Sequence, residues 1–546
     1  MRAIRAKIAR LSGLEIDMRR IVMVFLALLA GLASAILLTS AAGQAASAAP
    51  TPAPWPMFHR DERHSGVITD AAGDILPDAG PLVRWTYQVY TPTVPVTNVR
   101  WAATMPLGDL DGDGKLEVVV TTPGGSGAPD RVMALKDTPG QSPPVRPLWI
   151  YTSTLPPGET SFDQYSSALV DVDGDGKLDV IFSDNVGVVR ALKGTNGLLL
   201  WSYSTNHYIE SGPMVADLNG DGHKQIIVVT DCDKTLLNCP GRSDSGALFV
   251  LGANPTATLI YSATFPYKMD SAEPVIADID HLDGTARKAI IIGTWGGYLL
   301  TVWRDPGGTI YTNTLNIREL VSPTVPMSMP SAIRSSPLVA DFGEGPTAVF
   351  GWVPNENSPV DAYISAVGLS GNMDAGTVGF TARWSYAVDA WKSSVALLPV
   401  TSPPLVVAGY GIAVPPNSQS GIVGGCDPAQ VRGGIIALDW QGNVAWHHDY
   451  GGAEGNIRGS AAVADLDGDG VLDVVLPIGC YGALKAYNGL SGDLEWVRQL
   501  GPRTQASPSL GDLDGDGKLE VVVASYDGNV WVFQGGARLY LPLVVR

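Results

Sequence analysis

The segment LGDLDGDGKLEVVV, residues 107–120, joins an alternating Asp loop to an apolar run and recurs along the chain. Close copies are LVDVDGDGKLDVIF at 169–182, VADLDGDGVLDVVL at 463–476 and LGDLDGDGKLEVVV at 510–523. In each copy a short apolar strand precedes the Asp and Gly residues and a second apolar strand follows them. The chain is therefore built from a repeated supersecondary unit.

Weaker copies extend the series to eight units. VADLNGDGHKQIIV begins at Val215, and eroded forms begin at Ile276 and Val339. A further apolar segment begins at Ser393, where residues 399–404, PVTSPP, replace the Asp loop. Successive loops are about 46 to 66 residues apart, which is the scale of propeller blades.

The second unit shows the expected content of one blade. It predicts strands at 166–171, 178–183, 188–192 and 198–203, separated by the Asp loop and by polar turns. The last unit supplies only three strands, and residues 81–87, PLVRWTY, resemble the missing fourth. Their pairing would close the ring and remove exposed strand edges. We predict an all-β fold, a single propeller of eight four-stranded blades with seven as the alternative, closed by the N-terminal strand.

The N-terminus predicts export. The first 20 residues carry six Lys or Arg, and residues 21–38 form an apolar run that small residues at 41–48 follow. This predicts a signal peptide cleaved between about Ala42 and Ala49, with a retained membrane anchor as the alternative. The protein would then be secreted or lie at the cell surface.

Composition supports the same organisation. The 546 residues include 63 Gly and 40 Pro with 16% charged residues, which suits short strands and turns. We expect a signal or anchor at 1–48, a Pro-rich lead segment at 49–80, the propeller at 81–536 and a short apolar tail at 537–546, which sorts the protein or caps the last blade. Removing residues 1–45 takes away six positive and two negative charges and changes the net charge from −18 to −22, which argues against nucleic acid as a partner.

Four cysteines suit an exported chain. Cys232 with Cys239, and Cys426 with Cys480, are feasible disulfides, but their connectivity stays open. Their spacing matches neither zinc ligation nor a thiol redox motif.

The Asp loops resemble cages for a hard cation. In the first loop Asp109, Asp111 and Asp113 hold positions one, three and five, the carbonyl of Lys115 falls at position seven, and Glu117 holds position nine. Calcium accepts six to eight oxygen ligands in flexible geometry, whereas magnesium requires a rigid octahedron with bound water. The corresponding sets are Asp171, Asp173, Asp175, Lys177 and Asp179; Asp465, Asp467, Asp469, Val471 and Asp473; and Asp512, Asp514, Asp516, Lys518 and Glu520.

A third loop is less complete. It offers Asp217, Asn219 and Asp221 but has Gln225 at position nine. The fourth loop has two extra residues before Asp283, and the fifth has Gly343 and Gly345 in place of the middle carboxylates, so we expect both to be empty. The sequence thus predicts four calcium ions, with a fifth if the third loop also binds.

Two other interpretations of the loops are weaker. Asp/Gly turns are common between strands, but four carboxylates in one nine-residue turn repel one another without a cation. An EF-hand needs flanking helices and Glu at position twelve, where these loops have apolar residues: Val120, Phe182, Leu476 and Val523.

These loops resemble the FG-GAP/VCBS repeat family, whose known members include the integrin α-subunit head domains. The resemblance covers about residues 81–536 and implies a propeller whose loops between the first two strands of a blade hold calcium. The chain departs from integrin heads in having eight candidate units, of which half lack a complete loop. The family is functionally diverse, so it implies fold and metal more firmly than ligand.

A second resemblance is to quinoprotein propellers. ALKGTNG at 191–197 with Trp201, and AYNGLSG at 486–492 with Trp496, are similar to their tryptophan-docking motif, and residues 55–61, WPMFHRD, to their start. Such a Trp packs against the neighbouring blade and needs no cofactor. His59 and His64 have no carboxylate partner at metal-ligand spacing, so we expect surface or packing roles for them.

The predicted function is binding. We expect an exported calcium-binding propeller that acts as a surface or extracellular, adhesion-like scaffold for a protein or polysaccharide, with no catalytic residues. The insertions at 121–130 and 413–432 are candidate recognition loops. The alternative is a quinoprotein-like dehydrogenase with pyrroloquinoline quinone at the centre of the ring, a role for which the sequence assigns no residues.

Overall fold

The computed structural model describes residues 54–77, 80–89, 104–122, 130–153, 166–231, 245–269, 272–280, 287–321, 331–354, 362–372, 376–388, 393–412, 432–451, 454–455, 457–501 and 503–535. The fold below is that of the described residues between 54 and 535. The predicted signal or anchor, the tail and most of both candidate recognition loops lie outside the described residues. No helix within the described ranges is long and apolar enough to cross a membrane.

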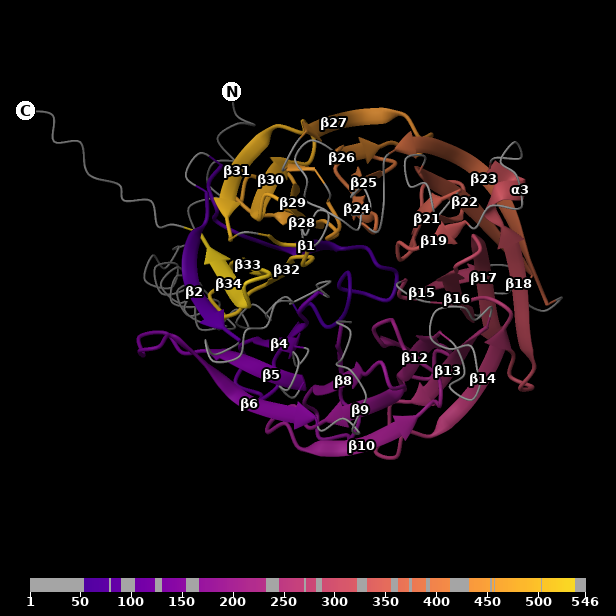
Figure 1. The fold of residues 1–546 in the computed structure, drawn as a ribbon, viewed down its shortest axis with the longest axis horizontal. Helices are drawn as coiled ribbons and strands as arrows, with labels where there is room; N and C mark the ends of the chain where they lie inside the picture. Colours follow the sequence, from indigo (N-terminus) through magenta and orange to yellow (C-terminus); the bar gives the residue numbers. More distant parts are fainter. Residues whose placement is uncertain are drawn as a thin grey trace, which may run out of the picture. The chain divides into compact units, whose positions relative to one another are not determined.

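Eight sheets, antiparallel except where β1 joins β28 in parallel, are arranged as the blades of a ring (Figure 1). Blades 1 to 4 contain β3 (Leu107–Gly108), β4 (Glu117–Thr122), β5 (Asp130–Asp137) and β6 (Val145–Ser153); β7 (Ala168–Val170), β8 (Asp179–Ser183), β9 (Val188–Leu192) and β10 (Leu199–Ser204); β11 (Met214–Ala216), β12 (Gln225–Thr230), β13 (Gly246–Gly252) and β14 (Leu259–Phe265); and β15 (Val275–Asp280), β16 (Arg287–Gly293), β17 (Tyr298–Arg304) and β18 (Ile310–Asn316). A short helix, α3 (Ile317–Val321), follows blade 4.

The remaining blades complete the ring. Blades 5 to 8 contain β19 (Ala332–Ile333), β20 (Leu338–Asp341), β21 (Pro346–Val353), β22 (Ala362–Asn372) and β23 (Thr377–Val388); β24 (Ala396–Leu398), β25 (Leu405–Ile412), β26 (Arg432–Leu438) and β27 (Val444–Gly451); β28 (Ala462–Asp465), β29 (Asp473–Ile478), β30 (Ala483–Asn488) and β31 (Leu494–Gln499), with β1 (Val67–Ala72) beside β28; and β32 (Ser509–Gly511), β33 (Glu520–Ala524) and β34 (Asn529–Gln534), with β2 (Leu82–Gln88) beside β34. The prediction of eight four-stranded blades is confirmed, and the seven-bladed alternative is wrong.

The ring closes through the N-terminal strand, as the sequence predicts. β2 pairs antiparallel with β34, with Thr86 opposite Trp531 and Tyr87 opposite Val530. Because β2 supplies the outermost strand of blade 8, two ends of the chain that lie far apart in sequence share one sheet.

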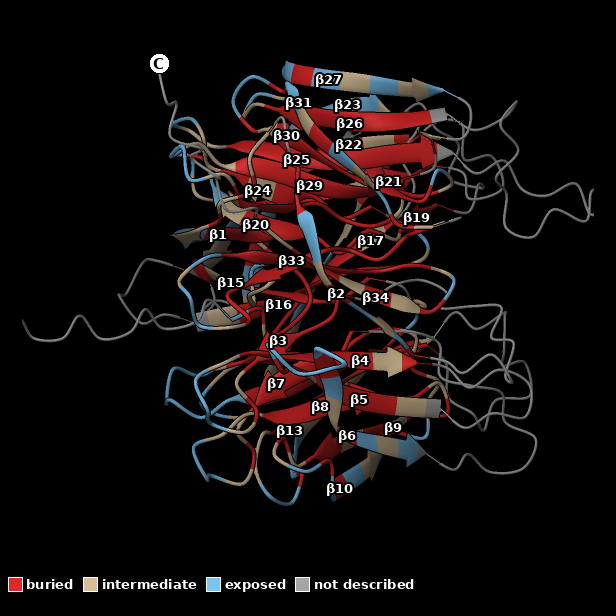
Figure 2. Cartoon of the chain, turned by 90° about the vertical axis from the view of Figure 1, so that its left-hand side faces the viewer, coloured by how far each residue is buried: buried red, intermediate tan, exposed pale blue. Residues whose placement is uncertain are grey.

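Burial follows the order of strands within each blade. The second strands are buried on both faces, as in β8 and β29, because neighbouring blades cover them. The outermost strands are largely exposed, as in β10 and β27 (Figure 2), but each buries one Trp, Trp201 or Trp446. Apolar packing between blades therefore forms the core.

Outer-strand tryptophans dock onto the next blade. Trp149 Nε1 donates to the carbonyl of Gly194 at 2.5 Å, and Trp446 Nε1 donates to that of Gly489 at 2.9 Å. A Cβ at Gly197 would lie 2.6 Å from the ring of Trp149, so a glycine turn is needed where the ring approaches. The glycine turns of both predicted motifs thus receive the tryptophan of the preceding blade.

The lead segment crosses the middle of the ring (Figure 1) and is part of the fold. Trp55 exchanges backbone hydrogen bonds with Leu107 of blade 1, at 3.1 and 2.8 Å. Backbone N–H groups of blades 2 and 4 to 8 donate to carbonyls between Pro56 and Ala72; the donors are Leu169, Ile276, Val339, Leu397, Val463 and Leu519. The segment therefore links the innermost parts of seven blades.

His59 and His64 lie in this crossing segment and are 1% and 0% exposed, respectively. His59 Nδ1 is 3.3 Å from the carbonyl of His64, and His64 Nδ1 is 3.0 Å from that of Pro337. Burial lowers the pKa of His59 to about 3 and that of His64 to about 4. Of the two roles expected for these residues, the structure shows the packing one.

Of the cysteines, Cys480 is described and is disulfide-bonded. Cys232, Cys239 and Cys426 lie outside the described residues, so the predicted pairings stay predictions.

Candidate metal centre

Each complete Asp loop folds around its first carboxylate. In blade 1 the N–H groups of Gly112, Asp113 and Gly114 donate to Asp109 at 2.7, 3.1 and 2.9 Å. Gly112 and Gly114 have φ values of 79° and 84°, which favour glycine. Blades 2, 7 and 8 repeat the contacts of both glycines around the carboxylates of Asp171, Asp465 and Asp512. The alternation of Asp and Gly thus specifies the loop conformation.

The carboxylate at position nine is buried in all four loops. Its exposure is 0% for Glu117, Asp179 and Asp473 and 2% for Glu520. One oxygen accepts the N–H of position two, for example Leu110 to Glu117 at 2.9 Å. Asp473 Oδ1 is buried without a hydrogen-bond donor among the described residues, and Glu117 Oε1 is buried with Lys136 Nζ 3.4 Å away. Such oxygens are suitable for a cation, because an unpaired buried charge is costly.

Three carboxylates converge in each loop. Their oxygens lie within 4.8 Å of one another in the groups Asp109, Asp111 and Glu117; Asp171, Asp173 and Asp179; Asp465, Asp467 and Asp473; and Asp512, Asp514 and Glu520. These are positions one, three and nine.

Positions five and seven hold the loop backbone. The carboxylates of Asp113, Asp175, Asp469 and Asp516 accept the N–H groups of Lys115, Lys177, Val471 and Lys518, at 3.1, 2.9, 2.7 and 2.9 Å. Position five is not part of the converging groups, and its predicted role as a ligand stays a prediction.

Burial makes these carboxyl groups hard to ionise without a cation. It raises the pKa of Glu117 to about 7 and that of Glu520 to about 9. Burial also raises the pKa of Asp179 and of Asp473, the latter with a contribution from the negative charge of Glu495. The all-oxygen ligand sets therefore fit a hard divalent cation such as calcium.

Basic side chains of the protein contact three of the loops. Lys136 Nζ contacts Asp111, lies 2.7 Å from Asp113 and is 3.4 Å from Glu117. In blade 2, Lys193 contacts the corresponding Asp173 and Asp175, and in blade 8 Arg84 lies 2.8 Å from Asp514. These basic residues were not predicted from the sequence, although Lys136 and Lys193 both follow Ala-Leu at the end of a third strand.

The third loop has the same turn but a different ninth residue. Asp217 accepts the N–H groups of Gly220 and Gly222 at 2.7 and 2.8 Å. Gln225 Oε1 accepts the N–H of Leu218 at 2.6 Å, as the carboxylates do elsewhere, while its Nε2 donates to the carbonyl of His223. This loop lacks the third converging carboxylate, and its calcium site stays a prediction.

The fourth and fifth loops are used for other contacts. Asp278 forms an ion pair with Arg63 of the lead segment at 3.1 Å. Asp341 accepts the N–H groups of Gly343 and Gly345 at 2.8 and 3.0 Å as an ordinary turn.

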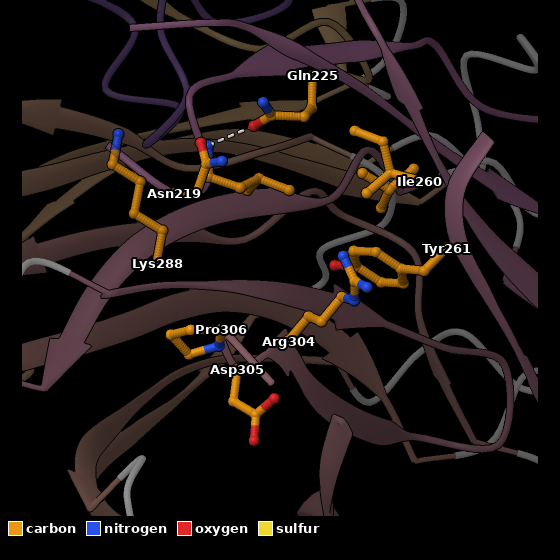
Figure 3. A pocket seen from close by; sticks show the side chains of 10 residues that line it. Asn219, Gln225, Ile260, Tyr261, Lys288, Arg304, Asp305 and Pro306 are labelled. Atoms are coloured by element: carbon orange, nitrogen blue, oxygen red, sulfur yellow. Dashed lines mark hydrogen bonds between the residues drawn. The ribbon is translucent and has the colours of Figure 1, made fainter. Parts of the chain in front are cut away.

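A pocket of about 400 Å³ lies beside the third loop, between blades 3 and 4. Figure 3 shows Arg304 next to Tyr261 on one wall and Lys288 with Asn219 on another. The guanidinium carbon of Arg304 is 5.8 Å from the centroid of the Tyr261 ring. The pocket thus combines an aromatic ring with two basic side chains in a strongly acidic protein.

Eight four-stranded blades in a ring define a β-propeller. In four of these blades an acidic loop with three converging carboxylates joins the first strand to the second. Family models agree: a model of the FG-GAP-like repeat matches residues 171–228, and one of the FG-GAP repeat matches residues 101–131 and 505–533. The chain is an eight-bladed β-propeller, and these three segments of it are similar to FG-GAP repeats. No curated protein sequence matches it.

Solved structures share the fold at low identity. A europium-containing methanol dehydrogenase is 13% identical with a TM-score of 0.50, over 88% of this chain and 98% of that one. Quinohemoprotein alcohol dehydrogenases from Pseudomonas putida and Comamonas testosteroni are 12% and 13% identical, with TM-scores of 0.53 and 0.50, each over 90% of this chain and 82% of theirs. At such identities the likeness establishes the fold alone.

Proposed function

We propose that this protein is an exported calcium-binding propeller that acts as a surface or extracellular binding scaffold. The observation that carries the proposal is the convergence of three carboxylates within 4.8 Å in four loops of one ring. Calcium would neutralise these loops and is available outside the cell at concentrations that suit sites of modest affinity.

The pocket between blades 3 and 4 is the proposed ligand site. Tyr261 offers a flat apolar face, and Arg304 and Lys288 offer charged donors to an anion. Lys288 is also paired with Glu62 of the lead segment, which holds it in place. This chemistry favours an acidic polysaccharide among the ligands considered.

A quinoprotein-like dehydrogenase is the second candidate, because the structural neighbours above include such enzymes. Its cofactor would need the centre of the ring, which the lead segment crosses with the buried His59 and His64. This course of the lead segment supports the scaffold proposal over the dehydrogenase. Purified protein is therefore expected to reduce no artificial electron acceptor with alcohols; quinone-dependent turnover would favour the dehydrogenase.

The calcium proposal is tested by metal analysis and melting of the full chain. Four bound calcium ions are expected, and sites with dissociation constants of 10⁻⁴ to 10⁻³ M would each contribute about 0.4 to 1.4 kcal/mol at 1 mM calcium. Chelation should lower the melting temperature, and calcium should restore it better than magnesium.

A double variant assigns one ion to one loop. Asp173→Ala with Asp175→Ala should remove about one ion, whereas Asp493→Ala, at an exposed turn of blade 7, should remove none. Fewer than about three ions in the unaltered protein, together with melting unaffected by chelator, would refute calcium binding. Export is tested separately by sequencing the N-terminus of the mature protein.

A further inference from the structure

The Asp loop of blade 7 has unusual surroundings. Lys136, Lys193 and Arg84 lie against the loops of blades 1, 2 and 8, respectively. Within the described part of the chain, no Lys or Arg forms an ion pair with the converging carboxylates of blade 7. This loop therefore carries the least compensated negative charge of the four.

Blade 7 adds a further carboxylate instead. Glu495, in β31, lies within hydrogen-bonding reach of Asp473 and of Asn488. Asp473 is fully buried, and its Oδ1 and Glu495 Oε2 have no hydrogen-bond donor among the described residues. Two carboxylates in contact without a donor between them repel each other unless they share a cation or a proton.

A β-bulge explains why Glu495 reaches the loop. Trp496 pairs with Ala486 and Leu494 pairs with Tyr487, so Glu495 is the extra, unpaired residue of the outer strand. A bulge re-aims a side chain away from the regular alternation. The unpaired residues at the same bulge of blades 1, 2 and 8 are Leu148, Leu200 and Arg84.

Arg84 shows that a side chain at the bulge of the outermost strand can contact the Asp loop of its own blade. From the bulge of β2 its guanidinium reaches Asp514, at position three of the blade 8 loop, at 2.8 Å. Blade 8 thus places a cation where blade 7 places an anion, and blades 1 and 2 place an apolar side chain. Calcium affinity rises with the charge of the ligand set.

We propose that Glu495 is an additional acidic residue of the blade 7 calcium site and makes it the tightest of the four. The proposal rests on the calcium binding proposed above. It adds that Glu495, which lies outside the loop, raises the affinity of the blade 7 loop for calcium. The blade 7 site should fill first when calcium is added.

The test is a calcium titration of the full chain against a chromophoric chelator, with the number of bound ions followed by native mass spectrometry. Glu495→Gln, which preserves shape and removes charge, should weaken the first site about 10- to 100-fold and leave the other three unchanged. Glu495→Asp should retain part of the affinity. In an Asp465→Asn background, which disables the blade 7 loop, Glu495→Gln should have no further effect on calcium binding.

Melting in chelator separates a metal role from a structural one. Without calcium, Glu495→Gln should melt at the same temperature as the unaltered protein or higher, because the carboxylate contact is relieved. The matched control is Glu454→Gln, in the same blade, which removes an ion pair with Lys485 at 2.9 Å and should leave every calcium affinity unchanged.

The outcomes distinguish the two proposals. If four ions bind and Glu495→Gln changes none of their affinities, the role of Glu495 is wrong and calcium binding stands. If Glu495→Gln lowers the melting temperature equally with and without calcium, Glu495 is structural and the proposal is overturned. If the unaltered protein binds no calcium, the underlying function fails.

Discussion

Removal of calcium should increase local opening of the ring at the pairing of β2 with β34 before the other blades unfold. The four complete loops lie on blades 7, 8, 1 and 2, which are consecutive around the ring and flank the pairing of β2 with β34. The loops also contact one another and the lead segment: Leu116 N–H donates to Leu513 at 3.2 Å, Lys177 Nζ to the Asp111 carbonyl at 2.6 Å, and Gly73 N–H to Asp465 at 2.7 Å. Bound ions would thus stabilise the pairing of β2 with β34 that closes the ring.

The magnitude follows from mass action. Four sites that each contribute about 0.4 to 1.4 kcal/mol at 1 mM calcium would together contribute about 1.6 to 5.6 kcal/mol. Since about 1.4 kcal/mol changes an equilibrium tenfold, local opening of the closure should become at least about 15-fold more frequent when calcium is chelated. Blades 3 to 6 have no group of three converging carboxylates among their described residues, so local opening of these blades should change much less.

Hydrogen exchange with mass spectrometry measures this difference. Peptides from β2 and β34 should exchange faster in chelator than in calcium, and peptides from β16 and β17 of blade 4 should serve as the internal control. Equal acceleration in both regions would refute the reasoning, because calcium would then stabilise the ring as a whole. Unchanged exchange at β2 and β34, with four ions bound, would refute it too.

Three further outcomes are expected. The buried His59 and His64 have folded-state pKa values of about 3 and 4, below the unfolded value of 6.5, so their contribution to stability is present above about pH 6.5 and is lost as the pH falls towards 4. Lowering the pH from 7 to 5 should therefore reduce the free energy of unfolding by about 2 kcal/mol for each histidine. In denaturant titrations His64→Asn should make this pH dependence weaker, whereas His223→Asn, on the exposed third loop, should leave it unchanged. Gly492→Ala places a Cβ 2.7 Å from the Trp446 ring at φ 77° and should destabilise by about 1 to 3 kcal/mol more than Gly140→Ala, which has the same φ but open space, as thermal melting would show. Arg304→Ala and Tyr261→Ala should each weaken binding to an acidic polysaccharide in a glycan-array or calorimetric assay, whereas Arg146→Ala on the exposed β6 should not; equal binding by all three variants would remove the pocket from consideration.

Local pattern was enough to predict the blades and the ring closure. The strands predicted at 166–171, 178–183, 188–192 and 198–203 match β7 to β10, because each apolar run lies between a loop and a turn whose residues favour reversal of the chain. Even the unit in which PVTSPP replaces the Asp loop forms a blade, since β24 and β25 keep the apolar alternation on either side. Repetition made such weak copies recognisable.

The course of the lead segment could not be predicted in this way. Its hydrogen bonds join carbonyls between Pro56 and Ala72 to residues hundreds of positions away, and nothing in its own composition specifies those partners. The course of the lead segment through the ring also determines that His59 and His64 are buried. An imidazole in a Pro-rich segment suggests exposure, whereas the crossing of the ring buries both side chains completely.

The candidate cation loops depend on both local sequence and the folded ring. The nine residues of each loop determine its conformation, because the first Asp, the glycines and the ninth carboxylate satisfy one another locally. The net charge around the loop depends on the bulge of the outermost strand and the end of the third strand, which are more than ten residues away and meet the loop only in the folded blade. Four loops with nearly the same sequence are therefore not four equivalent sites: Lys136 and Lys193 compete with a cation, Arg84 restrains an aspartate, and Glu495 adds to the negative charge.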